Sequence, residues 1–481
     1  MNIFDVFHER VKQQPDHFAI IDGGSDKMYT YAQLLEEIEI KAELLSNEGI
    51  QRGQCLGVHL TNSPDYIIMS YAGWRLGACI VPIANEMALD EKLFLCKDIA
   101  LDAVISRTKD SRVFDSVKIR ESKNLYKDIN IIPICKSREH PKDFLKTNPA
   151  FLRFTSGTTG RAKGVIISHE SINERIHAVN RILNIGNNDS VLWLLSMAYH
   201  FTVSIVSYLS FGATIVLSNS FMGEPIIRLI QRMKCTVIYA SPTHYQLMNN
   251  TGSAELPNLR LAISTTGGIS SEVTDKFYEL FHVPISQAYG IIEVGLPFIN
   301  IDKPKEKSSS VGRILPDYEV LLEDNGLGDN MRGIKLRGKG FFDAYYEPWC
   351  IREDCLKDGW FDTGDLGIID EEGYLFITGR SKEIINLAGM KFFPHEVEEI
   401  LERHHAVKEA CVFPYAKGQF EEIPYAYIVI EKSALHIPKE KLETELTEYC
   451  AHHLSHYKIP ERFIFVDKLK RTASGKLIRC N

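Results

Sequence analysis

A run of hydroxyl and glycine residues ending at a lysine is the strongest chemical signal in the chain. It lies in FLRFTSGTTGRAKGV, residues 151–165, just before the apolar segment VIISHESI. Glycines let backbone N–H groups approach phosphate oxygens, hydroxyls add neutral donors, and a lysine offsets the charge of a pyrophosphate leaving group. The pattern therefore predicts a phosphate-binding loop. Its residues are Thr155, Ser156, Gly157, Thr158, Thr159, Gly160 and Lys163.

This loop is not a Walker A motif. That motif requires GxxxxGK followed by Ser or Thr, whereas Ala162 precedes the lysine and Gly164 follows it. A Ser/Thr/Gly run by itself is equally typical of a flexible surface turn. Its position between two strand-like segments favours the phosphate-binding interpretation.

Short apolar segments alternate with amphipathic segments on both sides of the loop. GQCLGVHL is typical of a strand, DYIIMSYAGWRLG of the helix that follows, and ACIVPI of the next strand. The same pattern recurs at LDAVIS, ATIVLSN, CTVIYASP and LRLAISTTGG. Strands separated by helical segments predict parallel sheets built from βαβ units.

The pattern changes twice in the last third of the chain. After about residue 305, VGRILPDYEVLLEDNGLGDN is turn-rich, which predicts an antiparallel barrel or sheet. Beyond Gly379 and Arg380, a compact α+β unit is expected. Its helices are HEVEEILERH and KEKLETELTEYCAHHL, and its strands are EACVFPY and YAYIVIE.

One apolar stretch, residues 191–217, contains no Asp, Glu, Lys or Arg. Its length alone would suit a transmembrane helix. It also contains His200, several hydroxyl residues and Gly212, and it lacks clear flanking anchors. We therefore predict a buried strand, turn, helix and strand in this region, and no membrane span.

Composition limits the class of protein. The 481 residues are 44% hydrophobic, enough for two to four domains at roughly 100–200 residues each. A net charge of −8 disfavours nucleic acid and anionic lipid as partners. The ten cysteines form no CxxC pair and the N-terminus has no signal-peptide pattern, so we expect free thiols in a reducing, cytoplasmic compartment.

Eight ordered motifs, taken together, resemble the adenylate-forming superfamily of acyl-CoA synthetases, adenylation domains and beetle luciferases. The resemblance covers nearly the whole chain. Besides the phosphate loop, the motifs are YTYAQL (29–34), YAGWRLGACIVPI (71–83), SMAYHFTVS (196–204), TTGG (265–268), QAYGIIEVG (287–295), GWFDTGDLG (359–367), GRSKEIINLAGMKFFPHEVE (379–398) and YKIPERFIFVDKLKRTASGKLIR (457–479).

The resemblance implies an α/β multidomain fold. A large N-terminal domain, residues 1–381, would contain two βαβ-type subdomains and a small β-barrel-like subdomain, and would bind the acid and ATP. A small mobile α+β domain, residues 382–481, would carry the catalytic lysine. The implied reaction joins a carboxylic acid to ATP as an acyl-adenylate, releases pyrophosphate, and transfers the acyl group to a thiol.

The resemblance also assigns roles to individual residues. Lys476, His200 and Glu293 are implied in catalysis, with Glu293 also binding Mg²⁺. Besides the phosphate loop, the implied nucleotide-binding residues are Gly267, Gly268, Tyr289, Asp365, Ile377 and Arg380.

These assignments agree with the chemistry of the side chains. Asp365 offers an acceptor for vicinal ribose hydroxyls, and Arg380 a planar fork for ribose or phosphate oxygens. Glu293 supplies a hard oxygen for Mg²⁺, and Tyr289 a face for adenine. The ammonium of Lys476 would screen the repulsion between the incoming carboxylate and the α-phosphate.

The sequence departs from the family pattern in three places. Ile292 replaces a threonine expected near the α-phosphate, a loss that Thr266 could offset. Lys470 replaces a proline in the last motif, and Arg161-Ala162 stands where a variable residue and proline are usual. None of these changes removes a charged catalytic group.

The segment after the aromatic gate residue, His200, constrains the identity of the acid. Amino-acid-activating relatives place an aspartate there to hold the α-ammonium, and YHFTVSIVSY contains no acid. The expected pocket lining is apolar to weakly polar, which favours an aryl or medium-sized fatty acid. The lining residues are Phe201, Val203, Ser204, Thr265, Ile291, Val294 and Leu296.

Either CoA or an acyl carrier protein could supply the thiol, since both present a phosphopantetheine arm. In the family the C-terminal domain swings about a residue that corresponds to Lys382. Lys476 then leaves, and the loop containing Gly389 gives room for the narrow arm. We favour CoA, with a carrier protein as the alternative, and expect a monomer or homodimer.

Other interpretations of the sequence remain open at this point. A luciferase-like oxygenase would share the adenylation step but consume oxygen without a thiol. A non-catalytic binding protein would not need Lys476, Asp365 and Glu293, all of which are present. His452, His453 and His456 could pair on one helix face, but no third metal ligand is suggested. Ser168-His169 is not a nucleophile–base pair, because adjacent residues diverge on a strand.

Overall fold

The computed structural model describes the chain except residues 137, 156–162, 219, 325–330, 388–389, 418–420, 472–476 and 478–481. Its internal contacts divide the chain into two compact units. The first consists of Met1–Val320, Leu336–Phe361 and Ile369–Phe376, and the second of Leu321–Lys335, Asp362–Ile368 and Ile377–Asn481. The chain crosses between the units several times, so each unit is built from non-contiguous segments.

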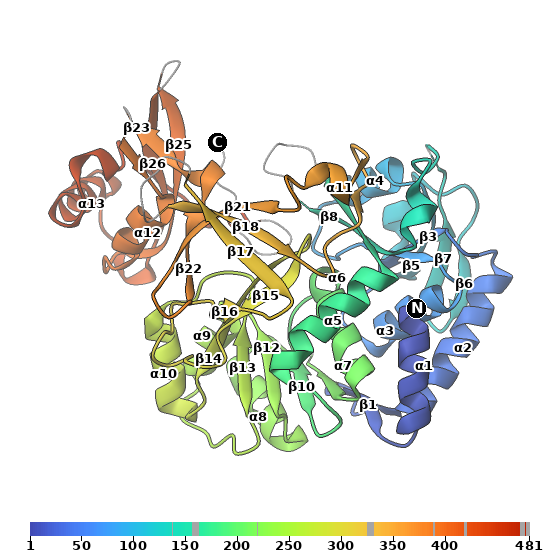
Figure 1. Cartoon of the computed structure of the whole chain (residues 1–481). Helices are drawn as coiled ribbons and strands as arrows, with labels where there is room; N and C mark the ends of the chain where they lie inside the picture. The colour runs from blue at the N-terminus through green and yellow to red at the C-terminus, as the bar shows by residue number, and fades with distance from the viewer. Residues whose placement is uncertain are drawn as a thin grey trace. The chain divides into compact units, whose positions relative to one another are not determined.

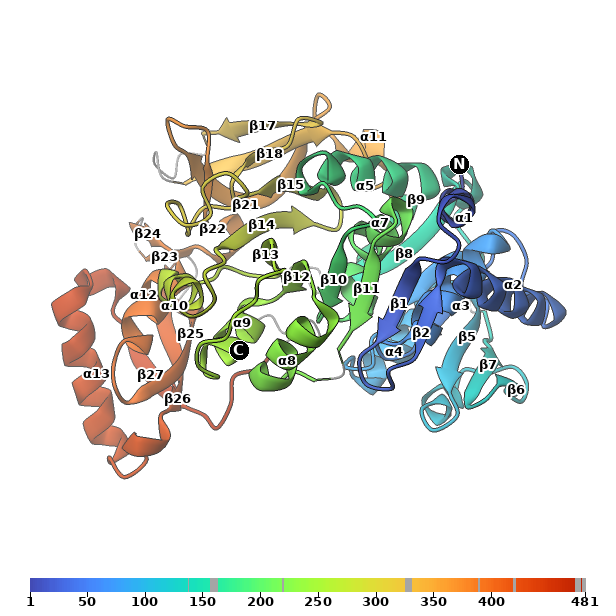
Figure 2. The same ribbon diagram turned by 90° about the horizontal axis from the view of Figure 1, so that it is seen from below.

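The first unit contains a nine-stranded sheet whose central strands are parallel, as the βαβ pattern predicted. Figure 2 shows its central strands side by side. Its order is β16 (Arg313–Ile314), β15 (Gly295–Ile299), β14 (Ile285–Ile291), β13 (Leu261–Ser264), β12 (Val237–Ala240), β10 (Ser190–Trp193), β11 (Thr214–Leu217), β1 (Phe18–Asp22) and β2 (Met28–Thr30).

A second nine-stranded sheet in the same unit has a parallel centre with antiparallel strands at both edges. Its order is β20 (Cys350–Ile351), β19 (Ala344–Tyr345), β9 (Lys163–Ser168), β8 (Pro149–Thr155), β4 (Cys79–Pro82), β3 (Cys55–His59), β5 (Leu101–Arg107), β7 (Ile129–Pro133) and β6 (Lys123–Tyr126). The two sheets confirm the expectation of two βαβ-type subdomains.

Helices cover these sheets through their apolar faces. Around β10, β11 and β12, the core is closed by α8, α9 and α10, whose buried residues include Ile226, Tyr245 and Phe277; these helices lie beside their strands in Figure 1. The helices of the first unit are α1 (Ile3–Gln13), α2 (Tyr31–Asn47), α3 (Pro64–Arg75), α4 (Leu89–Asp98), α5 (His169–Leu183), α6 (Met197–His200), α7 (Ile205–Phe211), α8 (Gly223–Met233), α9 (Pro242–Asn249), α10 (Ser271–Phe281) and α11 (Arg352–Cys355).

The uncharged stretch of residues 191–217 folds as predicted. It contains most of β10, then α6, a 3₁₀ turn at Phe201–Val203, α7 and β11. Its hydrophobic side chains are buried in the unit's core, as Leu192, Ile205 and Val216 illustrate. Among the described residues, no helix is both long and apolar enough to cross a bilayer.

The turn-rich segment after residue 305 contributes to an open four-stranded sheet, not to a closed barrel. Its order is β17 (Tyr318–Glu323), β18 (Arg332–Gly338), β21 (Phe361–Ile369) and β22 (Leu375–Arg380). A barrel would require the outer strands, β17 and β22, to pair with each other, and the described strand order leaves them at opposite edges. The boundary between the two units passes through these strands.

The rest of the second unit is a small α+β fold, as expected. Its core joins β25 and β26 to α12 and α13 through residues such as Val412, Ile428, Val397 and Leu446. The elements are β23 (Ile385–Leu387), β24 (Met390–Phe392), α12 (Pro394–Glu402), β25 (Val407–Lys417), β26 (Glu421–Ile430), α13 (Lys439–His453) and β27 (Arg462–Phe465).

Candidate active site

Strand register in the second sheet places the end of the phosphate loop beside a tyrosine from much later in the chain. The antiparallel strands β8 and β9 flank the loop and pair Thr155 with Lys163. On the other side of β9, β19 pairs Tyr345 with Val165. Because side chains alternate along a strand and paired residues share a face, Lys163 and Tyr345 lie on the same face of the sheet.

Tyr345 links the lysine to the predicted metal ligand. The Lys163 ammonium lies 4.6 Å from the centre of the Tyr345 ring, within cation–π range. The Tyr345 hydroxyl donates a hydrogen bond of 3.3 Å to Oε1 of Glu293. Burial, together with the charge of Glu293, raises the pKa of Tyr345, so the phenol stays protonated and remains a donor to the carboxylate.

The turn that carries Glu293 is held by a buried arginine that the sequence analysis did not identify. Arg175, on α5, donates from Nη1 to the Ile292 carbonyl at 2.8 Å and from Nη2 to the Glu293 carbonyl at 3.1 Å. Its Nε donates to the Gly340 carbonyl. The side chain is 1% exposed, and burial lowers its pKa to about 10. Arg175 therefore fixes the backbone from which Glu293 projects.

Replacing Arg175 with methionine should destabilise the fold and slow the reaction. The carbonyls of Ile292 and Gly340 would lose the donors that Arg175 supplies, and the Glu293 carbonyl would keep only the Phe342 amide. We expect this to cost about 3 kcal/mol or more, and Glu293 would lose its fixed position. We expect the midpoint of thermal unfolding to fall by several degrees. Arg228→Met is the matched control, since Arg228 lies on the surface of α8 and is 75% exposed. Equal midpoints for the two variants would contradict this role of Arg175.

Glu293 fits the requirements of a magnesium ligand that shares its ion with a nucleotide. One carboxylate oxygen accepts from Tyr345, and the side chain is only partly buried. Among the residues the structure describes, no cluster of three or more His, Cys, Asp or Glu side chains could hold a metal alone. Mg²⁺ commonly binds one or two carboxylates together with substrate phosphates, so a single glutamate beside a phosphate loop suits it.

The turn expected to lie against adenine is strained and open. Thr266 has a φ of 80°, a backbone conformation that β-branched residues rarely adopt. Strained backbone of this kind clusters at active sites and ligand-binding segments. A Cβ built on Gly267 or Gly268 would meet no described atom within 4 Å, so a flat ligand could approach this backbone. Tyr289 lies on the next strand, β14, where its ring packs edge-on against Phe298.

The second unit brings the predicted ribose-binding residues together. Asp365 on β21 is 3% exposed, and its Oδ1 lies 2.8 Å from Nε of Arg380 on β22. Ile377 precedes Arg380 on the same strand and is partly buried. The predicted hinge residue, Lys382, lies in the short 3₁₀ turn Ser381–Glu383 that follows. The Asp365 carboxylate and the Arg380 guanidinium are thus held in contact with each other without a ligand.

The residues expected to line the acid pocket are mostly buried. Phe201 is 1% exposed and packs against the rings of Tyr66 and Trp74. The Ser204 hydroxyl donates to the carbonyl of His200, whose ring lies 6.5 Å from that of Trp193. Thr265, Val294 and Leu296 are buried and Ile291 is partly buried; the side chain of Val203 is outside the description.

Several predicted site residues lie outside the described part of the chain. They are Ser156, Gly157, Thr158, Thr159 and Gly160 of the phosphate loop, Gly389 and Lys476. The side chain of Thr155 is also not described. The roles of these residues stay predictions. The two residues flanking the segment of Lys476, Arg471 and Leu477, pair in an isolated antiparallel bridge.

Two other residue groups considered in the sequence have structural contacts. The Ser168 hydroxyl accepts from the Ser171 amide at the start of α5, and the His169 ring accepts from the Ile3 amide. Burial lowers the pKa of His169 to about 4. His453, at the end of α13, packs against Tyr449. Neither group joins the cluster around Glu293.

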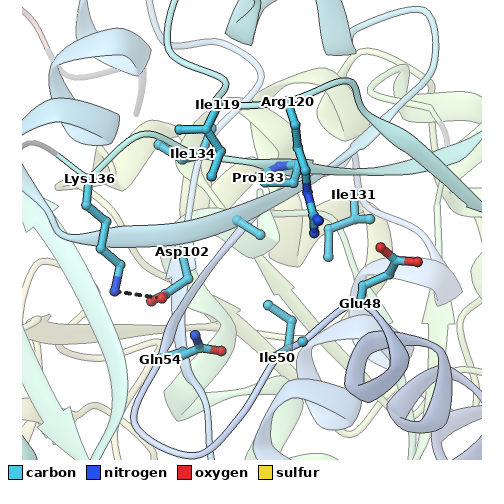
Figure 3. A pocket seen from close by; sticks show the side chains of 12 residues that line it. Glu48, Ile50, Gln54, Asp102, Ile119, Arg120, Ile131, Pro133, Ile134 and Lys136 are labelled. Atoms are coloured by element: carbon cyan, nitrogen blue, oxygen red, sulfur yellow. Dashed lines mark ion pairs between the residues drawn. The ribbon is translucent and has the colours of Figure 1, made fainter.

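A surface pocket of about 360 Å³ lies elsewhere in the first unit (Figure 3). Its apolar lining includes Ile50, Ile131 and Ile134, and Lys136 pairs with Asp102 at 2.7 Å in its wall. None of the predicted site residues lines it.

Comparisons with known proteins identify the family. A family model described as "AMP-binding enzyme" matches residues 7–346, and one described as "AMP-binding enzyme C-terminal domain" matches residues 396–476. The chain is 28% identical to a 2-succinylbenzoate–CoA ligase of Bacillus subtilis, over 98% of this chain and 96% of the relative. It is 26% identical to a long-chain-fatty-acid–CoA ligase of Mycobacterium tuberculosis, over 99% and 97%.

Solved structures of one related synthetase also match nearly the whole chain. The o-succinylbenzoate CoA synthetase of Bacillus subtilis in complex with its acyl-adenylate intermediate has a TM-score of 0.84 and 26% identity, covering 100% of this chain and 97% of that one. The same synthetase with ATP and magnesium ion has a TM-score of 0.84 and 25% identity, with 98% of each chain covered.

Proposed function

This chain belongs to the AMP-binding enzyme family, and from that premise we propose the acid it uses and the roles of its site residues. The protein is an ATP-dependent ligase. It activates a carboxylic acid as an acyl-adenylate, releasing pyrophosphate, and transfers the acyl group to the thiol of CoA. ATP, Mg²⁺ and CoA are its cofactors.

The contact series Lys163–Tyr345–Glu293 is the observation that carries the proposed roles at the triphosphate. Lys163 and the phosphate loop would hold the β- and γ-phosphates, while Glu293 would hold the magnesium ion against them. Bound Mg²⁺ would neutralise charge that develops on the pyrophosphate. Lys163 has no ion-pair partner among the described residues, so its charge is available to a ligand.

Asp365 and Arg380 would bind the ribose. A carboxylate accepts from vicinal hydroxyls, and the adjacent guanidinium both orients that carboxylate and offers donors to oxygen atoms. The backbone turn at Gly267 and Gly268 and the ring of Tyr289 would bind the adenine. Ile377 on β22 is a further nucleotide-binding residue in this proposal. The ammonium of Lys476 would screen the attack of the carboxylate on the α-phosphate.

We propose that the acid is an aryl or medium-sized fatty acid and that it binds beside His200 and Phe201. The apolar lining supports this class, as do the aryl and fatty acids in the names of the relatives. For the second step we propose that residues 382–481 rotate about Lys382, so that Lys476 leaves and the segment of Gly389 admits the pantetheine arm. The nine described cysteines are free, which supports a reducing compartment such as the cytoplasm.

The experiment that tests this function is a panel of aryl and fatty acids assayed with ATP, Mg²⁺ and CoA. We expect AMP, pyrophosphate and an acyl-CoA in equal amounts with the cognate acid. Adenylate formation without any acyl-CoA, followed by acyl transfer to a phosphopantetheinylated carrier protein, would replace CoA by the carrier protein as acceptor. Oxygen uptake in place of thioester formation would contradict the assignment.

A further inference from the structure

A second arginine, Arg153, is partly buried beside the phosphate loop and has no role in the reaction proposed above. Arg153 is on β8, two residues before Thr155, and pairs across the sheet with Val165. Val165 in turn pairs with Tyr345. Arg153 therefore lies on the same face of the sheet as Lys163 and Tyr345. It is the single charged residue in the strand PAFLRFT.

Arg153 makes few polar contacts for a partly buried cation. Its Nη1 donates to the Tyr199 carbonyl at 2.6 Å, and its guanidinium lies 5.0 Å from the centre of the Tyr199 ring. Its Nε is fully buried and makes no hydrogen bond. Among the described residues, no carboxylate lies within ion-pair distance of it. Burial lowers the pKa of Arg153, and the negative charge of Glu293 partly opposes this shift.

Arg153 lies near residues that we assign to the acid pocket. Tyr199 directly precedes His200 and Phe201, which we assign to the acid pocket. Tyr66, whose ring lies 5.4 Å from that of Phe201, is 1% exposed, and its hydroxyl is buried without a partner. Arg153 and Tyr66 also interact electrostatically. Arg153 Nε and the Tyr66 hydroxyl are thus two buried donors without partners beside residues that we assign to the acid pocket.

We propose that Arg153 binds a second anionic group on the acid substrate, so that the cognate acid is a dicarboxylate and not a simple monoacid. This inference rests on the proposed function. A guanidinium can hold a carboxylate through two parallel N–H···O bonds, and such a ligand would pair a charge that the protein leaves unpaired. An acid lacking the second carboxylate would leave Arg153 unpaired, so the enzyme should discriminate against it.

The experiment compares a dicarboxylic acid with its monomethyl ester at the distal carboxylate, because the two differ little except in that charge. Acid-dependent exchange of pyrophosphate into ATP gives kcat/KM for each compound. We expect the wild-type enzyme to prefer the diacid by about a hundredfold or more. Arg153→Gln keeps an N–H for the Tyr199 carbonyl but removes the charge, and it should bring the ratio close to one while leaving KM for ATP unchanged.

Arg228→Gln serves as the matched control, since Arg228 is a 75% exposed arginine on α8; it should keep the preference. Arg153→Met is a second neutral variant in case Arg153→Gln folds poorly, and thermal unfolding verifies both. Equal losses on diacid and monoester would show that Arg153 only holds the Tyr199 backbone, and would overturn the proposal. A raised KM for ATP with the preference intact would also overturn it, because Arg153 would then bind phosphate.

A failure of this inference is distinguishable from a failure of the proposed function. If the wild-type enzyme adenylates monoacids as well as or better than diacids, the role of Arg153 is wrong and the ligase assignment stands. If no acid of either kind supports pyrophosphate exchange, the ligase assignment itself is wrong.

Discussion

Replacing Lys476 with alanine should lower the rate of acid-dependent pyrophosphate exchange into ATP by about two to three orders of magnitude. The oxygens of the incoming carboxylate repel those of the α-phosphate, and negative charge builds between them as the new bond forms. A lysine ammonium placed there screens the repulsion in the ground state and follows the charge in the transition state. Alanine supplies neither effect.

Lys470→Ala is the matched control for Lys476→Ala. Lys470 is an exposed lysine in the same terminal segment, and its loss should change the exchange rate little. Thioester formation from a supplied acyl-adenylate should survive in Lys476→Ala, because that step does not use the ammonium. Exchange at the wild-type rate in Lys476→Ala would remove Lys476 from the adenylation step.

A leucine at position 389 should separate the two half-reactions. In Gly389→Leu we expect pyrophosphate exchange within a few-fold of wild type, and acyl-CoA formation lowered by about a hundredfold or more, because a 1 Å misplacement of a reacting group can cost this much. The position lies between β23 and β24, where Leu387 pairs with Met390. A side chain there would narrow the passage for the pantetheine arm only in the thioester-forming arrangement.

Stopped assays that measure acyl-adenylate and acyl-CoA separately would check this result, with accumulation of the adenylate as its signature. Met390→Leu is the control. Met390 is the next residue in the chain and is exposed, and methionine and leucine have similar volumes. Equal loss of both steps in Gly389→Leu would count against a C-terminal domain that alternates between two arrangements.

Most of the fold could be predicted because its elements have clear periodicity. The segments DYIIMSYAGWRLG and ACIVPI became α3 and β4, and KEKLETELTEYCAHHL became α13. The uncharged stretch of residues 191–217 was also predicted correctly, since its hydroxyl residues and glycine favour a buried strand and helix over a membrane span. Strand order was not predictable in the same way. It depends on pairings such as β1 with β11, which join residues about 195 positions apart in sequence.

The open sheet, where a barrel-like subdomain was expected, could not be predicted for a similar reason. The segment VGRILPDYEVLLEDNGLGDN shows short strands and turns, and these suit an open sheet and a closed barrel equally well. Closure is decided by whether the edge strands meet. That depends on β21 and β22, which follow at Phe361–Ile369 and Leu375–Arg380.

The candidate site was predicted where a motif is local and missed where contacts are long-range. Lys163 and Glu293 could be identified from their own segments. Tyr345 could not, because it reaches Glu293 through the register of β19 on β9, across 182 residues of sequence from Lys163. Position 292 remains a difference from the family pattern, and the structure gives Ile292 a backbone role through its carbonyl bond to Arg175.

The sequence around Arg175 and around Arg153 contains a signal that the sequence analysis did not use, namely a charge at a position expected to be apolar. Arg175 occupies the apolar face of α5, three residues after Ile172 and four before Val179, where a charge is unexpected. Arg153 interrupts an otherwise uncharged strand. A charged residue at a position that the pattern assigns to the core is expected to have a buried partner or a ligand. The amino-acid pattern alone therefore marks both positions as candidates for such a role.

The formation of an acyl-adenylate is the central claim, and an isotope measurement tests it most directly. The enzyme would be incubated with ATP, Mg²⁺, CoA and the cognate acid carrying ¹⁸O in its carboxyl group, and the AMP analysed by mass spectrometry. The account predicts one ¹⁸O atom in the phosphate of AMP, because the carboxylate oxygen attacks the α-phosphorus and stays with AMP when the thiol takes the acyl group. AMP free of ¹⁸O, or ¹⁸O in inorganic phosphate released with ADP, would contradict it.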